Sequence, residues 1–261
     1  MLKLSTDLPP GALLGEARAE LRNQLAGTST IWLSGDNGGL ETDGASGAVT
    51  GWTSVNGAVR AVPSQPNTGN SRTFVVDGRK GLATRSGENC GMVLSHVTPD
   101  ATNFSFAVIY QPDAEAPAMT LLTLNTGYQV EKSRDANYLF LSDDGKDLTV
   151  KDTNLDLHVQ TPVTSPSDRP RMLIVTLAGD RLSIAENLGA PVISQGARPL
   201  LAHPADLFIG CRSHRKGLQK TLGQSTILDV FFWPQSTLLL PRSESDGALS
   251  LALRRYFLWE F

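Results

Sequence analysis

The stretch that decides the fold is Leu207-Phe-Ile-Gly-Cys-Arg212, followed by Gly223-Gln-Ser-Thr-Ile-Leu-Asp-Val-Phe-Phe-Trp-Pro234. The first segment is a short apolar run that stops at Ile-Gly, and a basic loop comes after it. The second segment is rich in β-branched and aromatic residues and stops at a proline, which cannot donate to a strand ladder. This order predicts two strands of a β-sandwich with an exposed loop between them.

Further strands are predicted outward from this stretch, because alternating or β-rich runs are separated by turn residues. The clearest hairpin joins 171–177 to 181–185 through Gly179-Asp180. We expect about a dozen strands by this rhythm. No alternation of strand and helix occurs, so a parallel α/β sheet is disfavoured. The other predicted strands are 30–33, 72–78, 103–110, 119–124, 137–142, 148–151, 207–210 and 226–233.

Helical spacing appears at both ends of the chain. Leu13, Leu14, Ala17, Leu21 and Leu25 recur at the spacing of one helix face, and Ala26-Gly27 has the form of a glycine C-cap. Near the C-terminus, Ser243, Ser245 or Asp246 provides an N-cap for a helix over 248–257. Its predicted apolar stripe is Leu249, Leu253, Tyr256 and Phe257.

Three segments are therefore predicted. Residues 1–29 form an arm with a short helix, residues 30–242 form the sandwich, and residues 243–261 form a helix that packs on it. The arm either packs on its own domain or docks onto a partner, and the sequence leaves both alternatives open.

Composition excludes several classes of protein. The 261 residues are 40% hydrophobic and 19% charged, which is ordinary for a globular protein. A net charge of -3 predicts no general attraction to nucleic acid or to an anionic membrane. No run of 18 apolar residues occurs, and residues 1–24 lack the pattern of a secretory signal, so neither membrane insertion nor signal-dependent export is expected. The two cysteines, Cys90 and Cys211, are expected to be buried thiols, although their pairing stays open.

The order of these segments resembles the concanavalin A-like lectin/glucanase superfamily, and within it the laminin G-like jelly-roll domains. The resemblance covers about residues 30–257 and implies an all-β, antiparallel jelly-roll sandwich. One departure is Glu186-Asn-Leu-Gly189 after the hairpin, where the family often has Asn-Gly. The matching segments are Ile31-Trp-Leu33 with Asp36, Phe74-Val-Val-Asp-Gly78, Phe104-Ser-Phe-Ala-Val-Ile-Tyr110, 173–180, 207–210, 223–233 and 253–256.

Catalytic signatures are weak. The superfamily's glycosidases need two carboxylates about 5–9 Å apart, which on one strand would appear as Glu-x-Asp-x-Glu, and no such run occurs. Arg18-Ala-Glu-Leu-Arg22 resembles a motif of jelly-roll alginate lyases, but it lies in a predicted helix and no Gln-x-His accompanies it. The four histidines lack metal-ligand spacing, and no nucleophile-elbow or phosphate-binding glycine motif occurs. We therefore predict no enzyme and no catalytic residue.

Ligand binding is predicted at two places. The dense basic run 212–220 offers Arg212, His214, Arg215, Lys216 and Lys220 to an anionic partner, and Trp52 is a candidate for stacking on a sugar. No cofactor is predicted, except that the resemblance leaves room for calcium, for which no ligand set is defined. The oxygen-rich loop candidates for calcium are Asp36, Asn37, Asp143, Asp144 and Asp147.

A sugar-binding type of fold without an export signal suggests a protein released by lysis. We therefore predict a non-catalytic, virion-associated protein of a phage or gene-transfer agent, made in the host cytoplasm and displayed on the particle as a capsid decoration or spike. Its partners would be capsid or other virion proteins through residues 1–29 and host surface polysaccharide through the sandwich, in an oligomeric assembly. The alternatives are a purely structural cement protein and a glycan-degrading hydrolase or lyase.

Overall fold

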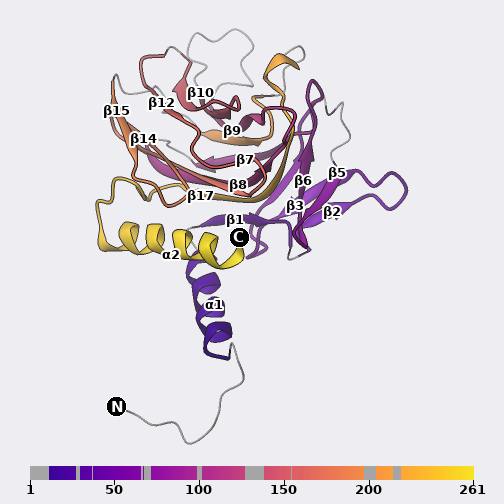
Figure 1. Ribbon diagram of the computed structural model, residues 1–261, viewed down its shortest axis with the longest axis horizontal. Coiled ribbons are helices and arrows are strands. Elements are labelled where there is room, and N and C mark those ends of the chain that lie inside the picture. Colours follow the sequence, from indigo (N-terminus) through magenta and orange to yellow (C-terminus); the bar gives the residue numbers. More distant parts are fainter. Residues whose placement is uncertain are drawn as a thin grey trace, which may run out of the picture.

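The computed structural model describes residues 12–27, 30–36, 38–65, 67, 72–98, 102–126, 138–153, 155–196, 204–213 and 219–261. Within these ranges the chain is an antiparallel β-sandwich with one helix at each end (Figure 1). The all-β prediction is confirmed at this level. The helices are α1 (Ala12–Leu25) and α2 (Glu244–Glu260), and a single 3-10 turn, η1, spans Gln219–Thr221.

The first sheet has the order β15-β14-β13-β8-β17-β6-β5, and β1 also pairs with β17. Strands β8, β13 and β17 lie side by side, as the hydrophobic runs predict, because a central strand is buried on both faces. Its strands are β1 (Ile31–Ser34), β5 (Arg72–Val76), β6 (Arg79–Thr84), β8 (Asn103–Pro112), β13 (Arg171–Ala178), β14 (Arg181–Glu186), β15 (Val192–Gln195) and β17 (Ser225–Trp233).

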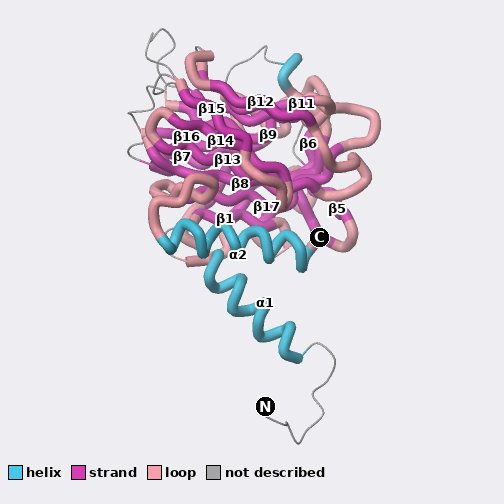
Figure 2. The backbone as a smooth tube through the Cα atoms, turned by 60° about the vertical axis from the view of Figure 1, so that its left-hand side comes forward, coloured by secondary structure: helices cyan, strands magenta, loops and turns pink. Residues whose placement is uncertain are grey.

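The second sheet has the order β12-β11-β10-β9-β16-β7-β4-β3-β2. It faces the first sheet across the sandwich (Figure 2). Its strands are β2 (Leu40–Thr42), β3 (Val49–Thr53), β4 (Arg60–Pro63), β7 (Met92–Thr98), β9 (Met119–Asn125), β10 (Tyr138–Asp143), β11 (Asp147–Asp152), β12 (His158–Pro162) and β16 (Ala205–Ile209).

The main core lies between the two sheets and follows the alternation expected of strands. Phe104, Phe106 and Val108 of β8 point into it. Their neighbours Ala107 and Ile109 point to the other face of the first sheet, where they join a second apolar cluster. The predicted alternation along this strand is therefore confirmed, and both of its faces are buried.

Helix α2 covers the outer face of the first sheet. Ser243 is its N-cap and accepts a hydrogen bond from the Asp246 amide, as its sequence predicts. Tyr256 packs edge-on against Trp32 of β1, with ring centroids 5.3 Å apart. Leu21 and Leu25 of α1 are buried in the same cluster, so the C-terminal half of α1 packs on the sandwich.

A buried ion cluster fixes the end of α2. Arg79 lies 3.0 Å from carboxylate oxygens of both Asp229 and Glu260, and Arg22 of α1 reaches Glu260 at the same distance. Burial raises the pKa of Asp229, and the Arg79 charge opposes that rise. This cluster joins both helices to the first sheet.

The structure also bears on the predictions for the two cysteines, the Arg18–Arg22 motif and membrane insertion. Cys90 and Cys211 are buried and do not form a disulfide, and burial raises the pKa of Cys211 to about 12. Arg18 and Arg22 lie in α1, where Arg18 donates to the Trp259 carbonyl, so the lyase-like motif is a helix surface. No helix in the described part of the chain combines the length and apolarity needed to cross a bilayer.

Candidate functional site

A pocket of about 220 Å³ opens at the end of the sandwich where β8 and β10 finish. Its walls are the loop Pro112–Ala118, the turn Asp143–Gly145, Ser167 and Arg171. It gathers four carboxylates, and we call it the carboxylate pocket. These carboxylates are Asp113, Glu115, Asp143 and Asp144.

The base of the carboxylate pocket is an ion cluster that joins the two sheets. Asp143 ends β10 in the second sheet, whereas Arg171 begins β13 and Tyr110 lies near the end of β8 in the first. Asp143 is paired with Arg171 and accepts a hydrogen bond from the Tyr110 hydroxyl at 2.5 Å. Burial raises the pKa of Tyr110, and the neighbouring Asp143 charge adds to that effect. Tyr110 therefore stays a protonated donor, and both oxygens of Asp143 accept hydrogen bonds, since Oδ1 accepts the Gly145 amide at 2.8 Å.

Glu186 completes this cluster. Its Oε1 lies 3.1 Å from Arg171 Nε, and its two oxygens accept hydrogen bonds from the backbone amides of Thr164 and Ser165. Burial tends to raise the pKa of Glu186, but hydrogen bonds from the hydroxyls and amides of Ser165 and Thr164 outweigh it and lower the pKa. Glu186 is therefore ionised and forms a second ion pair with Arg171, outside the lining of the pocket.

The other carboxylates stand at the mouth of the pocket. Asp113 Oδ1 accepts the Glu115 amide at 2.9 Å, and its Oδ2 accepts Gln224 Nε2 at 2.8 Å. These hydrogen bonds lower the pKa of Asp113, and the bond from the Glu115 amide has the largest effect. The pKa of Asp144 is lowered chiefly by the hydrogen bond from the Asp147 amide. Both are ionised near neutral pH, and Glu115 is exposed beside them.

A second pocket of about 300 Å³ adjoins the first and shares Pro112 and Asp113 with it. Phe74 lies in its lining, and this side chain is 58% exposed, which is unusual for an aromatic residue. Gln111 and Gln224 add amide groups, and Arg85 adds a cation. An exposed ring beside amides and a cation suits a sugar, which offers both an apolar face and hydroxyl groups. We call this the Phe74 pocket.

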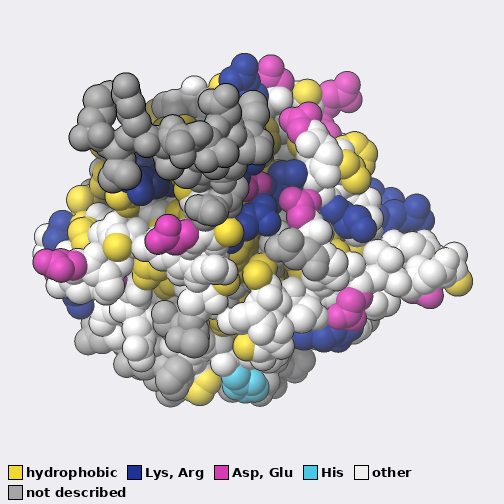
Figure 3. Space-filling view, turned by 90° about the horizontal axis from the view of Figure 1, so that it is seen from below, with side chains coloured by type: hydrophobic (Ala, Val, Ile, Leu, Met, Phe, Trp, Pro, Cys, Tyr) yellow, Lys and Arg dark blue, Asp and Glu magenta, His cyan; other side chains and the backbone are white. Residues whose placement is uncertain are grey.

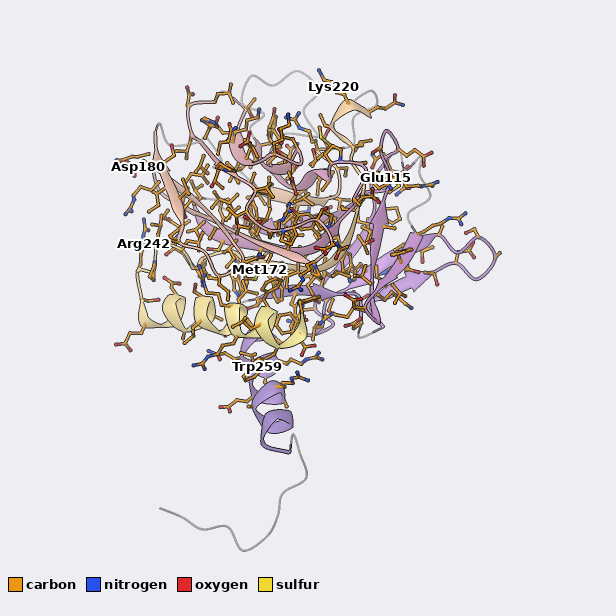
Figure 4. The ribbon with its side chains drawn as sticks, in the orientation of Figure 1. Glu115, Met172, Asp180, Lys220, Arg242 and Trp259 are labelled. Atoms are coloured by element: carbon orange, nitrogen blue, oxygen red, sulfur yellow. The ribbon has the colours of Figure 1, made fainter. Side chains whose placement is uncertain are left out.

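A third pocket, of about 720 Å³, lies around the start of β8 and the N-terminus of α2. Its lining is rich in hydroxyl groups, and its carboxylate, Asp246, already accepts hydrogen bonds from the Thr237 and Arg242 amides. Figure 4 shows Arg242 and Asp180 at one end of the sandwich and Glu115 at the other. The group of four carboxylates therefore lies at the end of the sandwich that carries Glu115.

The structure separates the residues predicted to bind a ligand. Trp52 is fully buried in the main core and donates its indole N–H to the Ser34 carbonyl, so it has no surface for stacking on a sugar. Arg212 is partly buried and Lys220 is exposed in η1. His214, Arg215 and Lys216 lie outside the described residues.

The calcium candidates are not brought together as one site. Asp36 pairs with Arg79 at 2.9 Å, whereas Asp143 pairs with Arg171 at another part of the sandwich. Asp144 lies in the β10–β11 turn, Asp147 begins β11, and Asn37 lies outside the described residues. In the described part of the chain no three or more His, Cys, Asp or Glu side chains are placed so that they could hold one metal ion, and this includes the carboxylates of the pocket. Figure 3 shows acidic and basic side chains interspersed on one face of the molecule.

Sequence reasoning missed the carboxylate pocket for a physical reason. Its carboxylates come from two turns, 113–115 and 143–144, that are about 30 residues apart in the chain but adjacent in space. A search for alternating carboxylates along one strand cannot detect such a set. The Pro112 stop after β8 and the Asp143-Asp-Gly145 turn were visible as turn signals, but nothing local shows that they meet.

This chain is similar to known proteins in its three-dimensional structure but not in its sequence. No family model matches the chain, and no curated protein matches it in sequence. Trypanosoma rangeli sialidase in complex with 2,3-difluorosialic acid aligns at a TM-score of 0.53 and 17% identity, covering 93% of this chain and 38% of the sialidase. An arabinofuranosidase complexed with arabinofuranosyl-α-1,2-xylobiose aligns at a TM-score of 0.52 and 10% identity, covering 80% of this chain and 51% of that enzyme. The chain thus spans about two fifths to half the length of these enzymes.

These comparisons correct two predictions. The expected non-catalytic, virion-associated protein is contradicted, since the structures matched here are glycosidases and nothing links the chain to a phage particle. The prediction that the chain is not an enzyme is contradicted by the same matches. At this level of identity the likeness establishes a β-sandwich shared with carbohydrate-acting enzymes. The sequence alternative of a glycan-degrading protein agrees with it better.

Proposed function

We propose that this chain degrades glycans as a glycoside hydrolase, with the reacting sugar in the carboxylate pocket. The observation that carries the proposal is the group of carboxylates at one end of a sandwich shared with glycosidases. Glycoside hydrolysis commonly uses one carboxylate as base or nucleophile and one carboxylic acid as proton donor. We also infer the finer fold, a concanavalin A-like jelly roll, from the two large antiparallel sheets and the pairing of β1 with β17.

Asp113 is the group best suited to act as base or nucleophile. Its lowered pKa keeps it ionised at neutral pH, and the Gln224 amide fixes one of its oxygens. Because its hydrogen bonds come from its own loop and from Gln224, it does not depend on a counter-cation that a sugar would have to displace. Arg171 is neutralised by Asp143 and Glu186 below it.

Glu115 is assigned as the proton donor. It lies two residues beyond Asp113 on the same loop, is exposed, and lines the same pocket. Its exposed carboxyl group can reach the glycosidic oxygen of a sugar bound in the pocket, which is the position that a proton donor needs. Asp144 faces the loop from the β10–β11 turn, where its negative charge would stabilise an oxocarbenium-like transition state.

The Phe74 pocket would bind the neighbouring part of the glycan. Its lining meets the carboxylate pocket at Pro112 and Asp113, so a chain of sugars can lie in both. Phe74 supplies an apolar face, and Gln111 and Gln224 supply hydrogen bonds. Its contribution should therefore appear mainly in KM, since it contacts parts of the substrate remote from the reacting bond.

The test is the release of reducing ends from a panel of neutral and acidic polysaccharides and oligosaccharides by the purified full chain. We expect release from at least one glycan class, with a single anomer formed first, and loss of release in the double variant Asp113→Asn/Glu115→Gln. No release from any glycan in the panel, or equal release by the double variant, contradicts the proposal.

A further inference from the structure

The outer faces of the two sheets differ in what covers them. Helix α2 and the end of α1 occupy the outer face of the first sheet, where they form the second apolar cluster. On the second sheet, Leu139 and Leu141 of β10 point into the main core, so Tyr138 and Phe140 lie on its outer face. Lys151 of β11 lies on the same face, in register with Phe140.

Arg212 packs against two aromatic rings of this face. Its guanidinium carbon lies 4.2 Å from the ring centroid of Phe140 and 4.7 Å from that of Tyr138, and it donates a hydrogen bond to the Tyr138 hydroxyl. Lys151 Nζ lies 5.2 Å from the centroid of the same Phe140 ring. Two cations, Lys151 of β11 and Arg212 from the segment after β16, therefore share one aromatic ring. We call Tyr138, Phe140, Lys151 and Arg212 the Arg212 site.

Arg212 differs in charge balance from the arginines of the ion clusters described above. Arg79, Arg171 and Arg60 each pair with carboxylates. Among the described residues, neither Arg212 nor Lys151 forms an ion pair. Aromatic rings stabilise a cation but do not neutralise it. A partly buried guanidinium that no described carboxylate neutralises favours an anionic ligand, because its planar N–H groups match a carboxylate in two-point contact.

The Arg212 site also lies near the carboxylate pocket. Phe140 and Asp143 belong to the same strand, and three residues of strand span about 10 Å. Asp143 and Asp144 line the pocket at the end of that strand. A glycan that extends from the pocket along the outer face of β10 would thus reach Arg212.

We propose that the Arg212 site binds a carboxylate-bearing sugar of the glycan, which makes acidic glycans the preferred substrate class. This inference rests on the proposed action on glycans, and it concerns binding rather than bond cleavage. Arg212 supplies the two-point contact with the carboxylate, Lys151 adds charge, and Phe140 and Tyr138 hold Arg212 in place.

The test is calorimetric titration of the full chain with oligogalacturonate, and with the same oligomer after methyl esterification, which removes the charge and keeps the sugar. We expect binding of the acid form, at least about tenfold weaker binding of the ester, and at least about tenfold weaker binding by Arg212→Met, equivalent to about 1.4 kcal/mol. Arg212→Lys keeps the charge but loses the planar fork, so we expect intermediate binding.

The matched control is Arg181→Met, which removes an exposed cation from the first sheet. It should bind as the unchanged chain does, and thermal unfolding should show that Arg212→Met is folded. Equal binding by Arg212→Met and the unchanged chain, equal binding of acid and ester, or no binding of the acid overturns the inference. Binding without hydrolysis of any glycan would instead refute the proposed enzyme, and hydrolysis of neutral glycans without this binding would refute the Arg212 site alone.

Discussion

Arg171, at the start of β13, forms a buried ion pair with Asp143, at the end of β10, and so joins the two sheets beneath the carboxylate pocket. Both side chains are almost completely buried. Tyr110 and Glu186 bind the remaining faces of the pair, at 2.5 Å from Asp143 and 3.1 Å from Arg171. The floor of the pocket is therefore set by contacts between residues from both sheets.

Removing one member of this pair should be costly. Arg171→Met leaves Asp143 buried without its cation, so we expect a loss of about 3–5 kcal/mol in the free energy of unfolding, measured with urea. The double variant Arg171→Met/Asp143→Leu removes the Asp143 charge but leaves Glu186 without its cation, so it should recover only part of that loss. A single variant as stable as the unchanged chain would show that the pair does not join the sheets energetically.

The Glu186 carboxylate predicts a specific acid sensitivity. Because the pKa of Glu186 is lower in the folded chain than in the unfolded one, its stabilising contribution is complete above the unfolded pKa of about 4.3 and is lost as the pH falls through the folded pKa. Glu186→Gln should cost about 1–3 kcal/mol at neutral pH and flatten the fall in stability between about pH 5 and pH 3. Urea unfolding across this range is the measurement, and an unchanged pH slope in the variant would contradict the assignment.

Truncation of Phe106 in the main core should lower the free energy of unfolding strongly. This side chain is fully buried between the sheets, so Phe106→Ala should cost about 3–5 kcal/mol of unfolding free energy. Phe74→Ala removes an aromatic side chain that is 58% exposed and should change stability by no more than about 0.5 kcal/mol. Similar losses for both variants would mean that Phe106 is not a core residue.

Helix α1 should contribute to the stability of the sandwich. Leu25 is fully buried in the second apolar cluster, so Leu25→Ala should cost about 2–5 kcal/mol. Leu251→Ala serves as the control, since Leu251 of α2 is 49% exposed. An unchanged free energy of unfolding for Leu25→Ala would support the sequence alternative in which this helix serves only a partner.

Much of the architecture could be predicted from local patterns. The long strands β8, β13 and β17 and the capped helix α2 have strong signals, because hydrophobic runs, turn residues and caps act within a few residues. Short or exposed strands such as β12 and β15 were missed, since their burial is set by the neighbouring strands and not by their own alternation.

The candidate site was harder to predict, and Trp52 and Arg212 show why. Trp52 reads as a candidate for stacking on a sugar, yet the pairing of β3 with β2 and β4 places it in the core. Arg212 was identified for its charge, but its rings, Tyr138 and Phe140, lie about 70 residues earlier in the sequence. The pairing of strands that are distant in the sequence buries Trp52 and brings Arg212 to its two rings. Local sequence patterns do not specify that pairing.

The central claim is that the Asp113 carboxylate takes part in bond cleavage. Its direct test is kcat for the glycan that the unchanged chain cleaves fastest, compared among the unchanged chain, Asp113→Asn and Asp180→Asn, the last of which alters an exposed carboxylate at the opposite end of the sandwich (Figure 4). We predict a loss of at least about 100-fold for Asp113→Asn and none for Asp180→Asn. A kcat for Asp113→Asn equal to that of the unchanged chain, with the fold intact, would contradict the claim.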